Sequence, residues 1–122
     1  MRHDPDALTL AEVVARACEL VDPDGVDAVV GELQQAFEDA DEPIRAVEDI
    51  ESRVGAVLAN LDPAVANPSL AVAGAVTIYL SYRRDEYGVE PAKLLRMAAE
   101  AEWQGDPPDL VGAWLADRGI SV

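Results

Sequence analysis

A chain of 122 residues, half of them apolar, is long enough to bury a core as one domain and too apolar to stay disordered despite its net charge of −15. That charge argues against binding nucleic acid through phosphate contacts, which require a basic face. One cysteine cannot form an internal disulfide, and the N-terminus has no apolar run typical of a secretion signal, so we expect a cytoplasmic protein.

The turn sequence DPDG, at residues 22–25, separates the first two predicted helices. Apolar residues recur at helical spacing over residues 8–21, and Thr9 or Asp6 is available as a cap. A second amphipathic helix is predicted from an apolar stripe after the turn, formed by Val26, Val29, Val30, Leu33, Phe37 and Ala40.

The stretch DPDGVDAVVGEL, residues 22–33, combines acids and glycines as a calcium loop does. An EF-hand loop needs oxygen ligands at positions 1, 3, 5 and 12 and glycine at position 6. With Gly25 at position 6, Leu20 falls at the first position and Gly31 at the twelfth, so two ligands are absent. We therefore predict a turn and a helix start here, with no metal and no other cofactor.

Pro43 suits the first position of a third helix, predicted over residues 43–61. The apolar residues of this segment are spaced three and four apart, which predicts packing along another helix at a shallow angle. They are Val47, Ile50, Val54, Val57 and Leu61.

Residues 64–82 carry no charged side chain. An Asn-Pro-Ser interruption leaves residues 70–82 strongly apolar, about 20 Å of helix against a bilayer core of about 30 Å, so no membrane span is expected. We predict a central, buried helix with Asn67 as its cap and Pro68 as its first residue. Residues 76–82 also alternate as a strand does, but no second segment offers itself as a pairing partner.

Two more helices are predicted in the last third of the chain. The first begins at Pro91 and ends near the GDPP sequence, and the second begins at that sequence and ends at Gly119. Ile120 is then positioned to fold back on Leu115 in a Schellman-type helix end.

Together these elements predict an all-α fold: a compact single-domain bundle of five to six helices over residues 1–122, with a central apolar helix. Residues 1–7 are expected to be flexible, which makes His3, the one histidine, a poor general base. Cys18 lies on the apolar face of its helix and is expected to be a buried, inert thiol. With no catalytic, nucleotide-binding or zinc signature, the sequence favours a protein that is not an enzyme.

Acidic residues gather in the first half of the chain. Residues 1–61 hold fifteen acids against four arginines, a net charge of −11, whereas residues 62–122 hold nine acids against five basic residues, a net charge of −4. The candidate partner-binding residues lie on both sides of the proline at position 43: Glu38, Asp39, Asp41, Glu42, Glu48, Asp49 and Glu51. No Glu-x-x-His motif accompanies them, so we expect a solvated face and not a metal site.

These features predict a small acidic interaction or regulatory module that binds a protein with a basic surface. Antitoxin-like or immunity-like inhibition of such a partner is one concrete form of this function. Adaptation to the host can produce the same acidity, and the acids could also mimic the charge of a nucleic acid. The sequence is also compatible with self-association of the chain into a homo-oligomer.

The alternative prediction is a helical domain that binds a small ligand or acts as an enzyme. Its pocket would be built around Tyr79, Tyr82, Arg83 and Arg84. The two arginines otherwise fit an ion-pair cluster at a helix end. Trp103 and Trp114 either close one end of the core or form an exposed binding patch.

Overall fold

The computed structural model describes residues 8–64 and 66–121, which form an all-α bundle with no strand among them. The predictions for residues 1–7 and for His3 lie outside this described part. The predicted fold class is confirmed, and the strand alternative for residues 76–82 is wrong, because those residues lie in a helix. The elements in chain order are α1 Leu10–Val21, α2 Ala28–Ala36, η2 Ile44–Ala46, α3 Ile50–Leu61, α4 Pro68–Tyr82, η3 Arg84–Glu86, α5 Pro91–Trp103 and α6 Asp109–Asp117, where η marks a short 3₁₀ helix.

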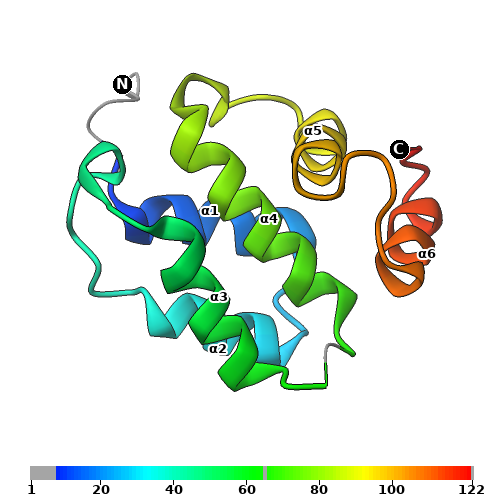
Figure 1. Ribbon diagram of the computed structural model, residues 1–122, viewed down its shortest axis with the longest axis horizontal. Coiled ribbons are helices and arrows are strands. Elements are labelled where there is room, and N and C mark those ends of the chain that lie inside the picture. Colours follow the sequence, from blue (N-terminus) through cyan, green and yellow to red (C-terminus); the bar gives the residue numbers. More distant parts are fainter. Residues whose placement is uncertain (1–7, 65, 122) are drawn as a thin grey trace.

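Helix α4 is the central helix of the bundle. Figure 1 shows it in the middle of the molecule, with α3 on one side and α5 and α6 on the other, and α1 also packs against it. Its apolar residues surround the helix instead of forming one stripe, as expected for a helix covered on several sides. Asn67 caps it by accepting a hydrogen bond from the Leu70 N–H at 3.1 Å, and Pro68 is its first residue, as predicted.

Among the described residues, none of the helices combines the length and the apolar composition that crossing a membrane requires.

Helices α3 and α4 approach each other closely at Gly74. A Cβ added to this glycine would lie 2.6 Å from Cδ1 of Leu58, which is inside van der Waals contact. The missing side chain therefore lets Leu58 pack directly against the backbone of α4.

The turn between α1 and α2 is built by two aspartate side chains. The carboxylate of Asp22 accepts hydrogen bonds from the N–H groups of Val26 at 3.0 Å and Asp27 at 2.9 Å. Asp27 then caps α2, since its carboxylate accepts from the N–H groups of Val29 and Val30. Two of the three aspartates of DPDGVDAVVGEL, Asp22 and Asp27, thus bind backbone donors of their own chain.

The turn between α3 and α4 repeats this arrangement. The carboxylate of Asp62 accepts from the N–H groups of Ala66 at 3.0 Å and Asn67 at 2.9 Å, and Asn67 caps the next helix. Asp62 ends α3 with φ −142° and ψ 66°, close to the φ −142° and ψ 65° of Asp22 at the end of α1. Two helix pairs are therefore joined by one type of connector, an Asp-Pro sequence followed by a polar cap five residues after the Asp.

The second helix is shorter than its apolar stripe. It begins after the cap Asp27, so Val26 lies in the loop and is 83% exposed. At the other end α2 stops before Phe37, which is buried as the C-cap residue. The helix predicted from apolar spacing is too long at both ends, because the spacing of apolar residues does not show where a side chain caps the backbone.

The third helix begins at Ile50 and not at Pro43 as predicted. The N–H of Ile44 donates a hydrogen bond of 2.7 Å to the carbonyl of Leu8, and the Ile44 side chain is buried. The backbone after Pro43 is therefore committed to the start of α1, which prevents a continuous helix.

The C-terminal helix ends as predicted. The N–H of Ile120 donates to the carbonyl of Leu115 at 3.0 Å, and the N–H of Gly119 donates to the carbonyl of Ala116 at 2.9 Å. Gly119 has a φ of +72°, the left-handed conformation that a Schellman end requires. Ile120 is buried, so this end closes the core.

Candidate functional site

The seven predicted partner-binding acids form what we call the acidic surface. All of them are exposed, and they lie on the segment that leads from the end of α2 through η2 to the first turn of α3. They are Glu38, Asp39, Asp41, Glu42, Glu48, Asp49 and Glu51.

Two of these carboxylates have partners in the described part of the chain. Glu42 forms an ion pair of 3.0 Å with Arg53, and Glu51 accepts a hydrogen bond of 3.0 Å from the Tyr82 hydroxyl. The side chains of the other five acids have no ion pair or hydrogen bond with described residues. Their charges are therefore directed to solvent.

The backbone that carries the acidic surface is held in place by α1. The N–H of Leu10 donates to the carbonyl of Glu42, and the N–H of Ala11 donates to the carbonyl of Ala40, both at 3.0 Å. These bonds satisfy backbone donors at the start of α1 and anchor the loop at the same time. The exposed carboxylates are thus mounted on a fixed backbone.

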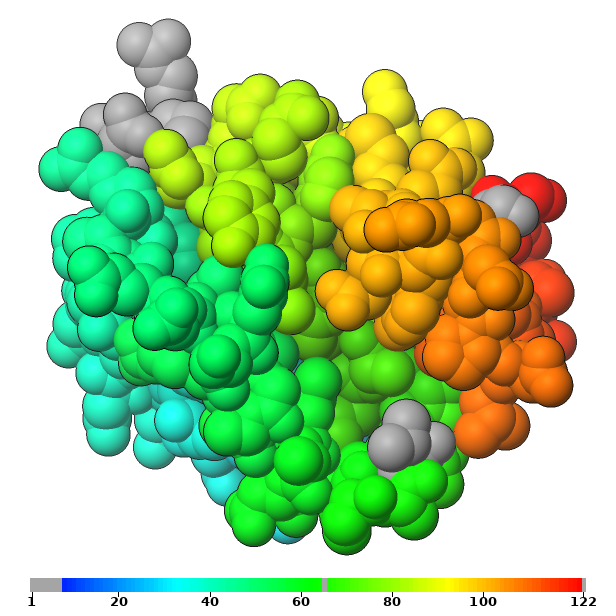
Figure 2. All heavy atoms as spheres, viewed as in Figure 1, coloured from blue at the N-terminus to red at the C-terminus, as the bar shows by residue number. Residues whose placement is uncertain are grey.

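A second feature, the α4 groove, runs along the side of α4 that borders α3 and, over its C-terminal half, also α5. Figure 2 shows this face hollowed between α3 in green and α5 in orange. The residues on its floor are spaced four, three and four apart on α4: Ala71, Ala75, Ile78 and Tyr82.

The groove contains two hollows that follow each other along α4. The first, of about 320 Å³, is lined by Glu51, Ala75, Ile78, Tyr79, Tyr82, Arg83, Ala98, Ala101 and Glu102. The second, of about 250 Å³, is lined by Gly55, Leu58, Ala59, Asp62, Leu70 and Ala71.

Three of the four residues predicted for a ligand pocket lie at the first hollow. They are Tyr79, Tyr82 and Arg83. Arg84 does not line it, and its guanidinium donates a hydrogen bond of 3.1 Å to the carbonyl of Ser81. The sequence placed these residues together because they lie within six positions of one another, but Arg84 belongs to η3 and is hydrogen-bonded to the last turn of α4.

The polar groups of the first hollow are tied to carboxylates. Arg83 pairs with Glu86 at 2.9 Å and with Asp85 at 3.8 Å, so its charge is compensated within η3. The Tyr79 hydroxyl donates to Glu86. Burial, followed by this hydrogen bond, raises the pKa of Tyr79 to about 12.

Tyr82 is held at the edge of the groove. Its side chain is 63% exposed, and its hydroxyl is fixed by the bond to Glu51. That hydrogen bond, together with the negative charge of Glu51 and then of Asp49, raises the pKa of Tyr82. The edge of the groove at Tyr82 therefore adjoins two negatively charged residues of the acidic surface, Glu51 and Asp49.

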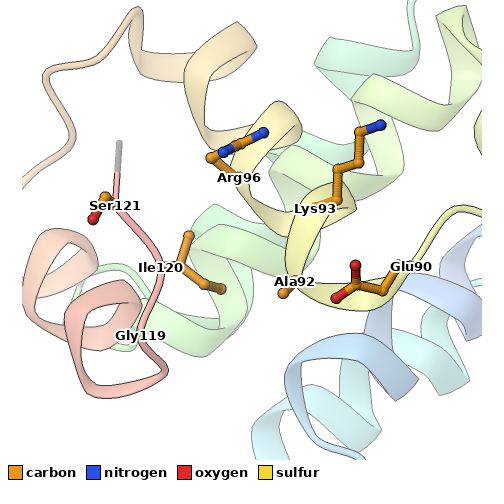
Figure 3. A pocket seen from close by; sticks show the side chains of 7 residues that line it. All are labelled: Glu90, Ala92, Lys93, Arg96, Gly119, Ile120 and Ser121. Carbon is orange, nitrogen blue, oxygen red and sulfur yellow. The ribbon is translucent and has the colours of Figure 1, made fainter.

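A third hollow, of about 410 Å³, lies between the start of α5 and the C-terminal segment. Figure 3 shows Glu90, Lys93 and Arg96 on the α5 side and Ile120 and Ser121 on the other. Neither Lys93 nor Arg96 forms an ion pair with a described residue. Sequence reasoning missed this pair, although a lysine three residues before an arginine on one helix marks a shared face.

The two tryptophans lie at the end of the core that α6 closes. Trp114 is buried, its indole N–H donates to the Ser69 hydroxyl at 2.8 Å, and Arg118 stacks over its ring at 3.5 Å. Trp103 is half-buried and packs against the same core. The geometry agrees with the interpretation of these residues as part of the core and not as an exposed patch.

The one cysteine lies in the interior of the bundle, as the apolar face of its helix predicted. Cys18 is buried, its thiol donates to the carbonyl of Val30 at 3.6 Å, and burial, helped by the charge of Asp22, raises its pKa to about 12. Over residues 8–64 and 66–121, no three His, Cys, Asp or Glu side chains come together as a metal site requires.

No protein-family model matches the chain, and no curated protein or solved structure does so either.

Proposed function

We propose that this protein is an interaction module that binds a basic surface of another protein through its acidic surface. The observation that carries the proposal is the set of five exposed carboxylates with no partner in the described chain, mounted on a loop that is hydrogen-bonded to α1. A rigid negative surface accelerates and orients the encounter with a positive one. Inhibition of a basic active site by direct covering is one form of this function.

The other properties of the chain fit the same proposal. A net charge of −15 repels phosphates, so the partner is a protein and not a nucleic acid. One buried cysteine suits a reducing, cytoplasmic compartment.

The alternative, a small-ligand-binding or enzymatic domain with its pocket near Tyr79, Tyr82, Arg83 and Arg84, has less support where the ligand is an anion. Arg83 is compensated by Glu86 and Asp85, and Arg84 is engaged with the carbonyl of Ser81. The first hollow of the groove therefore offers two carboxylates but no uncompensated cation, and an anion would be repelled there.

The test uses a charge-neutralised variant. Partners are captured from an extract of the source cells, and association and dissociation rates are measured at about 0.1 M and about 1 M salt, where the Debye length falls from about 10 Å to about 3 Å. The test variant carries Glu38→Gln, Asp39→Asn, Asp41→Asn and Glu42→Gln. We expect about a tenfold or larger loss of association rate at low salt, with a much smaller change in dissociation.

The matched control removes the same number of charges elsewhere. It carries Asp24→Asn, Glu32→Gln, Glu100→Gln and Asp117→Asn, all at exposed positions. If the test and control variants slow association equally, the association rate depends on the net charge of the protein and not on the acidic surface. If neither changes the rate, the acidity belongs to host adaptation and the proposal is wrong.

A further inference from the structure

We infer that the first hollow of the α4 groove binds one arginine or lysine side chain of the protein partner. The inference rests on the proposed function: it gives one basic side chain of the partner surface a defined binding site beside the acidic surface. It adds a determinant of specificity, since a surface of exposed acids alone discriminates poorly between basic partners.

The walls and floor of the hollow match the two parts of a long basic side chain. Ala75, Ile78, Ala98 and Ala101 give it an apolar lining, suited to the methylene groups of lysine or arginine. Glu51 stands on the first turn of α3 and Glu102 near the end of α5, on opposite sides. Both carboxylates line the hollow, so the charged end of such a side chain enters a region of negative charge.

The charges around the hollow favour a cation and no other ligand class. Glu102 has no ion pair with a described residue, and Glu51 accepts one hydrogen bond from Tyr82 and retains further acceptor capacity. The one cation of the lining, Arg83, is already paired with Glu86 and Asp85. The local balance is therefore negative, and an anion is excluded.

Tyr82 adds a third contact for a cation. Tyr82 is 63% exposed at the edge of the hollow, and its hydroxyl donates a hydrogen bond to Glu51. Because Tyr82 also lines the hollow, its aromatic ring is available to a cation bound there.

The position of the hollow connects it to the acidic surface. Glu51 belongs to both, so a basic segment attracted by the residues around Asp49 reaches the groove without crossing a neutral gap. Toward the start of α4, the second hollow, lined mostly by apolar residues such as Leu58 and Ala71, offers a further contact to the same segment.

The binding of single-residue probes to the isolated protein tests this inference. N-acetyl-arginine-N-methylamide is titrated into the protein and followed by NMR, with the neutral isostere, the citrulline derivative, as the comparison. We expect the arginine probe to shift the signals of Tyr82, Ala98 and Ala101 and to bind at least about tenfold more tightly than citrulline, because charge-assisted hydrogen bonds are lost in the isostere.

Charge variants show whether the carboxylates of Glu51 and Glu102 cause the preference for the arginine probe over the citrulline probe. Glu51→Gln with Glu102→Gln should remove the preference for arginine over citrulline. The matched control, Glu32→Gln with Glu100→Gln, changes the same net charge on exposed positions outside the groove and should retain it. Equal loss in both pairs would mean non-specific attraction, which overturns the inference.

A steric variant tests the place of binding without changing charge. Ala101→Leu narrows the first hollow from an exposed position, and we expect the arginine probe to lose about tenfold or more in affinity. Its melting temperature, compared with that of the unchanged protein, verifies folding. If a norleucine probe binds as tightly as the arginine probe, the groove is an apolar ligand site and the inference is wrong.

The two proposals fail in different experiments. Loss of arginine selectivity is measured without any partner, so it does not depend on whether the acidic surface binds one. With the partner bound, the variant carrying Glu51→Gln and Glu102→Gln should accelerate dissociation by about tenfold. An unchanged dissociation rate refutes the groove assignment and leaves the acidic surface standing.

Discussion

The hydroxyl of Tyr82 donates a hydrogen bond of 3.0 Å to the carboxylate of Glu51, which ties the last turn of α4 to the first turn of α3. Less than one turn earlier on α4, the hydroxyl of Tyr79 donates to Glu86. Both phenols face a carboxylate, so ionisation of either tyrosine places two negative charges side by side. The contacts at this end of α4 therefore depend on neutral tyrosines.

Alkaline pH should weaken the fold through these tyrosines. The pKa of Tyr79 is raised to about 12, chiefly by burial, and that of Tyr82 is raised chiefly by the hydrogen bond to Glu51. Since both values exceed the ordinary tyrosine pKa of about 10, this stability is present below about pH 10 and is lost as pH rises through the folded-state values. Tyrosinate absorbance, recorded against pH for native and denatured protein, checks this.

A variant assigns the titration to its residue. Glu51→Gln should move the pKa of Tyr82 back toward its ordinary value and leave that of Tyr79 unchanged. Coincident titration curves for native and denatured protein would contradict the prediction.

The two Asp-Pro connectors should contribute to stability in the same way. Asp22→Ala removes the acceptor of two backbone N–H groups, and Asp62→Ala does the same in the second connector. We expect each change to lower the free energy of unfolding by about 1 kcal/mol, as for other lost helix caps. Chemical denaturation measures this. Asp24→Ala, at an exposed position of the first connector, is the control, and an equal cost there would show that the carboxylate bonds do not matter.

Most of the fold could be predicted from the sequence because helix starts and ends are marked by capping residues, proline and glycine. Asn67 and Pro68 marked the start of the central helix, and Gly119 with Ile120 marked the end of the last one, because caps and Schellman ends depend on a few neighbouring residues. Pro43 misled the prediction, since its surroundings depend on backbone bonds to residues far away in the chain.

The candidate sites were predictable to different degrees. Exposure of the acidic surface follows from the charge of its side chains, which stay in water without structural help. The α4 groove was not predictable in full, because Glu51 and Glu102 meet its lining from helices far apart in the sequence. Tyr79, Tyr82 and Arg83 were found because they share one chain segment.

The thiol of Cys18 should be unreactive in the native protein. It is buried against Val30, and burial raises its pKa to about 12, so almost no thiolate exists near neutral pH. We expect a thiol-specific disulfide reagent to label native protein at least about a hundredfold more slowly than denatured protein. Equal rates would show that the region between α1 and α2 opens readily.

The central position of α4 gives the most severe stability prediction. Val76 is fully buried, at 0% exposure, whereas Val26 is 83% exposed in the first connector. Val76→Asp places an unpaired carboxyl group in the packed core and should cost about 3 to 5 kcal/mol of unfolding free energy. Val26→Asp, the same change in water, should cost less than about 0.5 kcal/mol.

A milder substitution keeps this test informative if Val76→Asp does not fold. Thr77, the next residue, buries its hydroxyl by donating to the carbonyl of Ala73 at 2.9 Å, one turn earlier in α4. Val76→Thr can make the equivalent bond to the carbonyl of Val72, so the hydroxyl is satisfied and the cost should be about 1 to 2 kcal/mol. Chemical denaturation then ranks the three variants, with Val76→Asp least stable and Val26→Asp most stable. Equal stability of the Val76 and Val26 aspartate variants would mean that α4 is not the buried centre of the bundle.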